Sequence, residues 1–219
     1  MIIDTIKHRM QKIWRKKRMS AFLERIEPKD NWKVLDLGGL PEMWEILDLD
    51  LEITLLNLPG EFIGQNNQLK HNYQFIEADA AGELPFEDHY FDLVFSNSVI
   101  EHLGSSEQEE KFAHSVHRLA PRYWVQTPSI WFPIEAHCNM PFWWFYPQSF
   151  QNLWIERWKQ KGYVFKWQQM LTTKVITLSR LKRLFPQGHV YTEYVAGFSK
   201  SYSIYYKIYS KLRPVKPQL

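Results

Sequence analysis

The stretch Lys33-Val34-Leu35-Asp36-Leu37-Gly38-Gly39-Leu40 decides how the rest of the chain is interpreted. A short apolar strand ends in an acidic residue and two glycines, and Pro41 follows. Glycine lets the backbone approach a ligand closely, and a proline at this point predicts a helix that begins near Pro41 and presents unpaired N–H groups. Alone, the pattern does not identify a ligand.

Short apolar runs recur along the chain between helical or loop segments. They lie at residues 33–35, 53–56, 73–76, 91–95 and 123–126. Helices are expected at 106–119 and 178–185, and residues 190–195 and 201–206, joined around Gly197, predict an antiparallel hairpin at the sheet edge. Strands that alternate with crossovers favour a parallel sheet. The predicted fold class is α/β: a Rossmann-like, mostly parallel sheet of seven strands with an antiparallel last hairpin and helices on both faces.

Polar side chains stand at the carboxyl ends of these strands, where a parallel sheet binds its ligand. Asn57 ends the second strand, at the position where nucleoside-binding sheets usually place a side chain that hydrogen-bonds the ribose hydroxyls. Asp79 and Ala80 follow the third strand, where a short acceptor suits an adenine amino group. Ser96 and Asn97 end the fourth strand and suit the amino-acid part of a cofactor. The strand ends together predict a nucleoside-type cofactor.

The run LPFEDHYFDLV at 84–94, followed by SNSVIEH at 96–102, resembles the class I S-adenosylmethionine-dependent methyltransferases, in their type 11, small-molecule branch. The resemblance covers residues 34–128 and implies S-adenosyl-L-methionine as the cofactor. It places the methionine and ribose beside Asp36, Gly38 and Gly39, the ribose hydroxyls on Asn57, the adenine at Asp79 and Ala80, and the sulfonium beside Ser96 and Asn97.

The chain departs from the family pattern at two positions. Leu40 stands at the second glycine of D-x-G-x-G, and Asn57 stands where an acidic residue is common. Leu40 adds a side chain where the backbone should contact the ligand. Asn57 forgoes a charge-assisted hydrogen bond, which is roughly twice as strong as a neutral one. We expect cofactor binding to persist but to be weakened.

Two histidines are the catalytic candidates. Methyl transfer needs the acceptor atom held in line at about 3–3.5 Å, and a base only when that atom carries a proton of high pKa. His102 follows the fourth strand and His137 lies after the fifth, so both are expected on the ligand side. Glu101 and Glu135 precede them and are candidates for orienting an imidazole or binding a polar substrate. The competing interpretation is a hydrogen-bonded structural histidine.

Residues 128–158 are expected to form an aromatic insert or lid. Trp131 and Phe132 within it are candidates for lining a dry acceptor pocket, while core packing and a surface that meets lipid are the alternatives. No metal site is expected, because the only cysteine, Cys138, lies beside His137 without metal-ligand spacing.

Residues 1–28 predict a basic amphipathic helix that ends at Pro28. Its apolar face is expected to hold Ile6, Met10, Ile13 and Trp14. Two interpretations stay open: the helix packs beside the sheet or lids the cofactor, or it contacts an anionic membrane or nucleic acid.

The remaining chain is expected to form one methyltransferase domain at 29–212 and a frayed tail at 213–219. A single cysteine, a formal net charge of +3 and no apolar run near 20 residues favour a cytoplasmic protein, free or attached to a membrane surface. The resemblance implies a bacterial enzyme that methylates a small molecule, a sugar or a lipid-linked glycan. It fixes neither the acceptor nor the oligomeric state.

Three alternatives compete with this interpretation. A methyltransferase-like binding module without turnover is motivated by Leu40 and Asn57. A nicotinamide-dependent oxidoreductase should show G-x-G-x-x-G, which Leu40 and Pro41 interrupt. Nucleic acid is disfavoured as a substrate, because Ser96-Asn97-Ser98-Val99 lacks the prolines and aromatic residue typical of nucleic-acid amino-methyltransferases.

Overall fold

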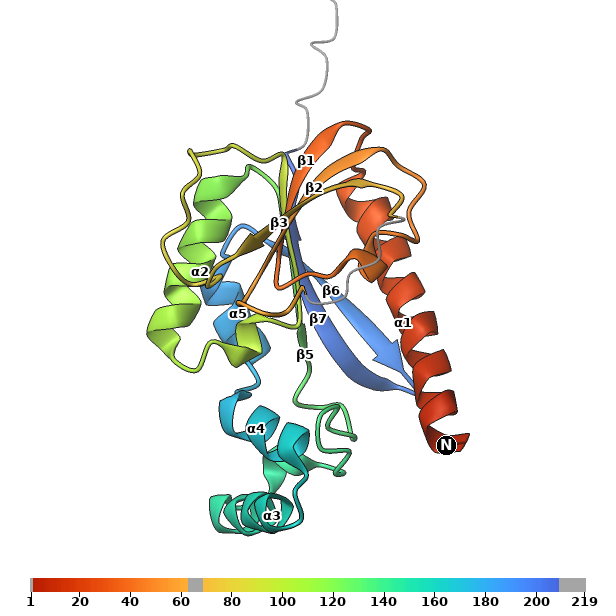
Figure 1. The fold of residues 1–219 in the computed structure, drawn as a ribbon, viewed down its shortest axis with the longest axis vertical. Coiled ribbons are helices and arrows are strands. Elements are labelled where there is room, and N and C mark those ends of the chain that lie inside the picture. The colour runs from red at the N-terminus through yellow and green to blue at the C-terminus, as the bar shows by residue number, and fades with distance from the viewer. Residues whose placement is uncertain (1, 63–68, 209–219) are drawn as a thin grey trace, which may run out of the picture.

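Seven strands form one sheet in the order β3-β2-β1-β4-β5-β7-β6 (Figure 1). The computed structural model describes residues 2–62 and 69–208, and side chains from residue 9 onward. The strands are β1 (Trp32–Leu37), β2 (Leu51–Asn57), β3 (Asn72–Glu77), β4 (Leu93–Asn97), β5 (Tyr123–Pro128), β6 (His189–Val195) and β7 (Phe198–Tyr206). The predicted frayed tail at 213–219 lies outside the described residues.

The first five strands are parallel, and the last two reverse direction. Central β1 pairs with β2 and β4, and Asp36 stands in register with Leu55 on one side and Phe95 on the other. The hairpin β6–β7 is antiparallel, and β7 inserts between β5 and β6. The mostly parallel sheet with a reversed last hairpin is therefore confirmed.

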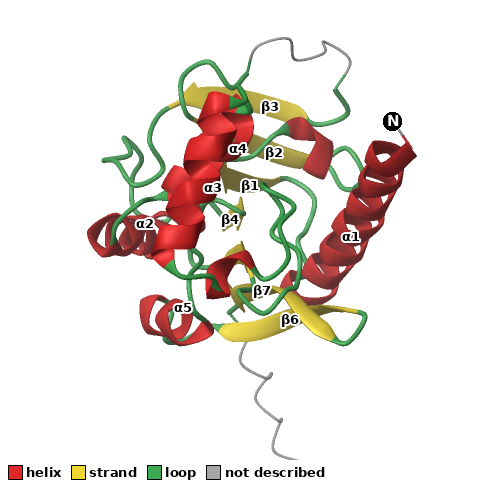
Figure 2. Ribbon diagram, turned by 90° about the horizontal axis from the view of Figure 1, so that it is seen from below, coloured by secondary structure: helices red, strands yellow, loops and turns green. Residues whose placement is uncertain are grey.

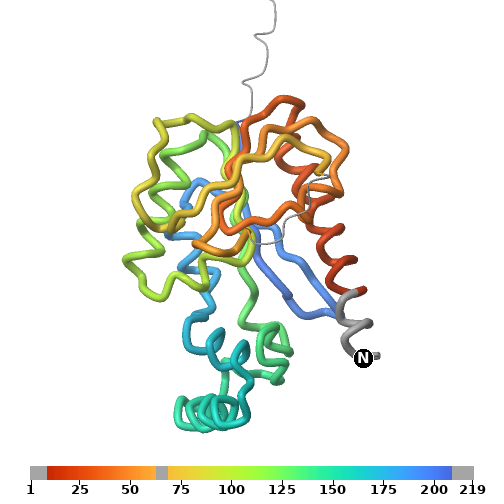
Figure 3. Tube along the Cα trace, in the orientation of Figure 1, coloured from red at the N-terminus to blue at the C-terminus, as the bar shows by residue number. Residues whose placement is uncertain are grey.

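Helices cover both faces of the sheet, as predicted. Helix α2 (Ser106–Leu119) and helix α5 (Leu178–Leu184) pack on one face around the fully buried Phe112 and Leu181. Helix α1 (Ile2–Ile26) covers the other face, where Phe22 contacts Phe95 and Trp124 with ring centroids 5.3 and 5.7 Å apart. The first and last described segments of the chain, α1 and the β6–β7 hairpin, lie side by side (Figure 3).

The apolar face predicted for α1 is wrong at Ile13, while Met10 and Trp14 are half-buried and the side chain of Ile6 lies outside the described residues. Ile13 is 57% exposed, whereas Met19, Phe22 and Ile26 in the second half of the helix are buried. The buried positions follow the helical spacing of three and four residues. They pack on the sheet because only this half of α1 lies over β1, β4 and β5, so the interpretation of α1 as a packing element is confirmed for residues 19–26.

The helix expected near Pro41 is also absent: a single 3-10 turn, η1 (Pro41–Met43), stands there. Only 13 residues join the end of β1 to the start of β2, and parallel strands need about a dozen or more for a crossover. Trp44 and Leu47 in this connection are buried against the sheet. Helix α1, which precedes β1, covers the face that this connection leaves open.

The aromatic insert after β5 has a small core of its own. It contains turn η3 (Trp143–Phe145), helix α3 (Gln148–Gln160) and helix α4 (Val164–Thr172). Trp143 and Trp158 are buried with Ile155 and Met170, so this core extends beyond residue 158. Figure 2 views the molecule from the insert side, with α3 and α4 in front of the sheet. Among the described residues no helix is both long enough and apolar enough to cross a bilayer.

Candidate functional site

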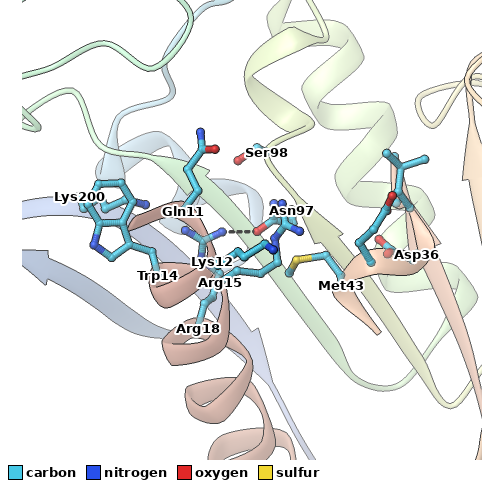
Figure 4. Close-up of a pocket in the computed structure, with 14 residues that line it drawn as sticks. Gln11, Lys12, Trp14, Arg15, Arg18, Asp36, Met43, Asn97, Ser98 and Lys200 are labelled. Carbon is cyan, nitrogen blue, oxygen red and sulfur yellow. Dashed lines mark hydrogen bonds between the residues drawn. The ribbon is translucent and has the colours of Figure 1, made fainter. Parts of the chain in front are cut away.

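Two cavities adjoin at the carboxyl ends of the parallel strands. The first, here called the α1 cavity, measures about 580 Å³ and lies between α1 and the ends of β1 and β4 (Figure 4). The second, the β2 cavity, measures about 550 Å³ and lies beside the ends of β2 and β3, with residues of α4 on its far wall. Gly38, Leu40 and Ser98 line both cavities. The cavities therefore meet where β1 and β4 end, the place at which a parallel sheet of this order binds its ligand.

Asp36 lies inside the end of β1 with 1% of its surface exposed. Its Oδ2 accepts a hydrogen bond of 2.7 Å from the indole Nε1 of Trp44, while Oδ1 is buried without a hydrogen-bond partner. Burial raises the pKa of this carboxyl from 3.8 to about 7, and the Trp44 bond opposes the rise only in part. An unpartnered buried acceptor beside the α1 cavity is suited to a hydrogen-bond donor of a ligand.

The two glycines after β1 are needed for packing within the protein. Gly38 has a φ of +75°, and a Cβ there would overlap Cγ2 of Val99. A Cβ at Gly39 would overlap the carboxylate of Asp36. Leu40 has an extended backbone with a φ of −131°, so its position does not require glycine. The departure from the family pattern at Leu40 is thus compatible with the observed loop.

The β2 cavity brings together the residues predicted at the second and third strand ends. Asn57 and Asp79 line it, and so does Ala80. The side-chain oxygen of Asn57 already accepts from the backbone N–H of Leu58 at 3.0 Å, and one oxygen of Asp79 accepts from Ala81 N–H at 2.9 Å. The second oxygen of Asp79 has no hydrogen bond within the described chain.

The residues predicted at the end of β4 have different places. Ser96 is fully buried, and its hydroxyl donates to the carbonyl of Leu37 at 3.0 Å, so it holds β4 against β1 instead of facing a cavity. Asn97 lines the α1 cavity, and its Oδ1 accepts a bond of 2.6 Å from Nη1 of Arg18 (Figure 4). Ser98 lines both cavities and donates to Oε1 of Gln126 at 2.9 Å.

A buried ion pair fixes α1 beside the α1 cavity. Nη2 of Arg18 lies 2.9 Å from Oε2 of Glu193 in β6, and both side chains are at most 9% exposed. Ser201 donates to the same carboxylate oxygen at 2.9 Å, and Nζ of Lys200 lies 3.7 Å from it. These cations and the hydroxyl hold the pKa of Glu193 below its usual range, although its burial acts in the opposite direction.

The candidate histidines lie in contact, with the ring centroids of His102 and His137 5.3 Å apart. Nδ1 of His102 lies 3.2 Å from the hydroxyl of Thr173, and Nδ1 of His137 lies 2.8 Å from Oε1 of Glu135. Burial, and next the charge of His137, lower the pKa of His102 to about 4. His102 also lines the β2 cavity. The fold thus brings together two histidines that are 35 positions apart in the sequence.

The two candidate glutamates are buried on either side of this pair. Glu135 accepts backbone bonds from His137 and Cys138 at 2.6 and 2.7 Å, and the His137 ring together with these bonds keeps its pKa low despite burial. Glu101 accepts from the hydroxyl of Thr127 at 3.1 Å, and its other oxygen has no partner. Burial raises the pKa of Glu101 to about 7. Both carboxylates therefore brace the backbone or neighbouring side chains around the histidines.

The aromatic candidates do not meet at the two cavities. Trp131 is 60% exposed and lines a separate apolar cavity of about 580 Å³ with Phe145 and Phe198. Phe132 meets Trp14 of α1 edge to face, with ring centroids 6.3 Å apart. In the part of the chain that the structure describes, no group of three or more metal-binding side chains is arranged to hold an ion.

Residues 37–121 match the family model described as a methyltransferase domain. This match contains the loop after β1, the ends of β2 to β4 and His102. Residues 37–121 are therefore a methyltransferase domain of the class I S-adenosylmethionine-dependent type. No curated protein matches this methyltransferase at a significant level.

Solved structures share the fold of this methyltransferase at low sequence identity. A Pyrococcus horikoshii protein is 16% identical with a TM-score of 0.55, and the alignment covers 86% of each chain. An Anabaena variabilis protein described as a methyltransferase from an antibiotic biosynthesis pathway is 12% identical with a TM-score of 0.53, over 81% of this chain and 64% of that one. Phosphoethanolamine N-methyltransferase 2 of Haemonchus contortus, in complex with S-adenosyl-L-methionine, is 18% identical with a TM-score of 0.51. The alignment covers 80% of this chain and 38% of the Haemonchus protein, so this methyltransferase spans well under half of that relative.

Several residues of the site were missed from the sequence. In the β2 cavity, Oε1 of Gln108 is buried without a partner, and Gln169 and Thr172 of α4 form the far wall. In the α1 cavity, the wall includes Lys12, Arg15, Arg18 and Lys200. The helical spacing of the three α1 residues gave a signal, since positions 12, 15 and 18 follow one another at intervals of three along one side of the helix. No sequence signal connected Lys200 to that face.

Proposed function

We propose that this methyltransferase binds S-adenosylmethionine across the two adjoining cavities and transfers its methyl group to a small-molecule, sugar or lipid-linked acceptor. The observation that carries the proposal is the junction of the α1 and β2 cavities at Gly38, Leu40 and Ser98, directly beyond the carboxyl ends of β1 and β4. A cofactor with a nucleoside at one end and an amino acid at the other fits two cavities joined in this way.

The donors and acceptors in the β2 cavity suit the adenosine part. The free oxygen of Asp79 and the unpartnered Oε1 of Gln108 are acceptors for an adenine amino group. Asn57 lines this cavity at the end of β2, with its amide nitrogen 3.4 Å from the Gly39 carbonyl and its oxygen accepting from Leu58 N–H. Ala80 leaves room for a flat ring. When bound, S-adenosylmethionine supplies the electrophilic methyl group.

The groups around the junction suit the methionine part and the transfer itself. The unpartnered Oδ1 of Asp36 lines the α1 cavity and can accept a hydrogen bond from a donor group of the ligand. Gln169 and Thr172 of α4 form one wall of the β2 cavity. For a hydroxyl acceptor, His102 is the candidate base: its pKa of about 4 keeps the ring neutral but makes it a weak base, and its Nδ1 lies 3.2 Å from the hydroxyl of Thr173.

Cofactor binding is tested by calorimetric titration of the full chain with S-adenosylhomocysteine. We expect Asp79→Ala and Gln108→Ala each to weaken binding about tenfold, since each removes an acceptor from the β2 cavity. Glu87→Gln is the matched control, because Glu87 is exposed and lines neither cavity. Wild-type affinity in both cavity variants would show that the nucleoside lies elsewhere.

A binding module without turnover remains the alternative hypothesis, motivated by Asn57, whose side-chain oxygen is already engaged by Leu58 N–H. A chain that binds S-adenosylhomocysteine, yet transfers no labelled methyl group to any fraction of a metabolite or lipid extract, would favour the module. Transfer to one fraction would support the enzyme and identify the class of acceptor.

A further inference from the structure

The wall of the α1 cavity is unusually rich in cationic side chains. Four of them line it, namely Lys12, Arg15, Arg18 and Lys200, against the carboxylates of Asp36 and Glu42. Figure 4 shows the α1 residues and Lys200 on one side of the cavity and Asp36 on the other. The cations come from both ends of the chain, so the fold, and not a local run of basic residues, brings them together.

Two of these cations have no ion-pair partner in the part of the chain whose side chains the structure describes. Arg18 is neutralised by Glu193, and Lys200 lies 3.7 Å from the same carboxylate with its ammonium over the ring of Trp14 at 4.7 Å. Among the described side chains, neither Lys12 nor Arg15 has an ion-pair partner. They stand three residues apart on one helix face, where like charges repel each other.

The charge of the proposed cofactor makes this arrangement costly unless an anion is present. S-adenosylmethionine carries a positive sulfonium, and its amino-acid end is a zwitterion. Charges of the same sign that are held close together at a protein surface repel each other. Burial, and next the charge of Arg18, lower the pKa of the Lys200 ammonium to about 8, while Glu193 opposes the shift.

We infer that the α1 cavity binds the phosphate group of the methyl acceptor, through Lys12 and Arg15 of α1 with Lys200 of β7. This inference rests on the proposed function and names the chemical class of its acceptor. A phosphate offers oxygens to the planar guanidinium of Arg15 and to the two ammonium groups. Its negative charge offsets the repulsion among the cations and the sulfonium. The acceptor is then a phosphate ester, either free in solution or part of a lipid headgroup.

The spacing along α1 supplies a matched control. Lys16 and Lys17 are as basic as Lys12 and Arg15 and belong to the same two turns, but they do not line the cavity. A helix that only attracts anions through its total charge would respond equally to either pair of substitutions. A helix that presents one face to a bound phosphate responds only to the cavity pair.

The test compares Lys12→Ala/Arg15→Ala with Lys16→Ala/Lys17→Ala in the full chain. Calorimetric titrations with sn-glycerol 3-phosphate are made with and without saturating S-adenosylhomocysteine. We expect the cavity pair to weaken glycerol phosphate binding at least tenfold and the control pair to change it less than threefold. Affinity for S-adenosylhomocysteine should stay within threefold of the wild type in both variants.

A second arm distinguishes the two sources of the phosphate. Co-sedimentation is measured with vesicles of phosphatidylglycerol and of phosphatidylcholine. If the soluble ester does not bind, but phosphatidylglycerol binding is lost in the cavity pair and kept in the control pair, the phosphate belongs to a lipid headgroup. Equal loss in both pairs would overturn the inference, because the helix would then be a general basic surface.

Failure of the inference is distinguishable from failure of the proposed function. If the cavity pair loses S-adenosylhomocysteine and glycerol phosphate binding together, Lys12 and Arg15 hold the cofactor carboxylate, and the phosphate site is refuted. If the wild type binds S-adenosylhomocysteine but neither glycerol phosphate nor phosphatidylglycerol, only the inference falls. If the wild type binds no S-adenosylhomocysteine at all, the proposed function falls.

Discussion

Arg18 of α1 donates a hydrogen bond of 2.6 Å from Nη1 to Oδ1 of Asn97, 79 residues away at the end of β4. The same guanidinium binds Glu193 of β6 through Nη2 at 2.9 Å. One side chain thus joins the first helix to a central strand and to the edge strand, at the wall of the α1 cavity. The helix is therefore part of the site as well as part of the core.

Removing this guanidinium should destabilise the protein. We expect Arg18→Ala to lower the free energy of unfolding by about 3 kcal/mol, because Glu193 would keep its buried charge with only Lys200 nearby. Urea unfolding followed by circular dichroism measures the change. Glu193→Gln in the Arg18→Ala background should recover part of the loss, whereas Lys16→Ala should be neutral. An Arg18→Ala variant as stable as the wild type would contradict the importance of the pair.

Gly38 is expected to contribute to the stability of the fold, in addition to any role in ligand binding. Gly38→Ala should lower stability, since its Cβ would overlap Val99 and a φ of +75° costs a residue with a side chain about 1–2 kcal/mol. Adding Val99→Ala should restore the steric part and leave the backbone part. Chemical denaturation of the single and double variants separates the two. No recovery in the double variant would show that Val99 is not the obstacle.

Stability should depend on pH through Asp36. Between its ordinary value of 3.8 and its folded pKa of about 7, the folded chain keeps a proton that the unfolded chain has lost. This group therefore lowers stability as pH rises through that window, by about 1.4 kcal/mol per pH unit. Glu101 acts in the same direction, and His102, with its lowered pKa, acts in the opposite direction below pH 6.5.

The Asp36 contribution is isolated by comparing Asp36→Asn with the wild type. An asparagine oxygen can still accept from Trp44, so the difference in unfolding free energy between variant and wild type should grow from pH 5 to 7. Glu87→Gln, at an exposed site, should show a constant difference. A constant difference for Asp36→Asn as well would mean that Asp36 is ionised throughout the range.

The ring of His102 should become protonated only at low pH. We expect the ring protons of His102 in NMR spectra to titrate below pH 5, because burial and His137 both disfavour its cation. His137→Gln removes the second cause and should raise the pKa of His102, while His114→Gln at an exposed position should leave it unchanged. Titration of His102 near 6.5 in the wild type would contradict the buried environment. With the low pKa that we predict for His102, the rate of methyl transfer to a hydroxyl acceptor should show no pH dependence from this residue between pH 5.5 and 9.

Anion binding in the α1 cavity should weaken at alkaline pH. Lys200 has a pKa of about 8, and a bound anion favours its charged form. Sulfate is a suitable probe because its own charge is constant between pH 6 and 10. Its dissociation constant should rise as pH increases through 8, and Lys200→Arg should move that rise beyond pH 10. A wild-type constant that is independent of pH would exclude Lys200 from the anion contact.

The strands were predictable because a parallel sheet buried on both faces needs apolar runs such as Val34-Leu35 and Phe91 to Phe95, and their carboxyl ends identified Asn57 and Asp79. The helix expected at Pro41 failed because the short connection to β2 buries Trp44 instead. Whether this connection forms a helix or a turn depends on the space available above the sheet, which cannot be predicted from the local sequence.

The basic helix was harder to interpret, for a different reason. Among its many Lys and Arg residues, the sequence did not distinguish Arg18 as the one that forms a buried ion pair, because its counter-ion Glu193 is 175 positions away. Ser96 was predicted to face the cofactor, but strands alternate their side chains, and the register with β1 turns its hydroxyl to Leu37. The helices α3 and α4 were not predicted, because aromatic and proline-rich segments lack a clear helical period.

The pairing of Arg18 with Glu193 has a consequence for biosynthesis. Helix α1 is synthesised before the sheet, but the strand that carries its counter-ion follows 175 residues after Arg18, and β7 must insert between β5 and β6. Contacts of such sequence separation slow folding, because a long loop has to close before they form. The α1 cavity is therefore completed only after translation has passed Lys200, and a nascent chain released earlier would have the glycine loop but no finished wall beside it.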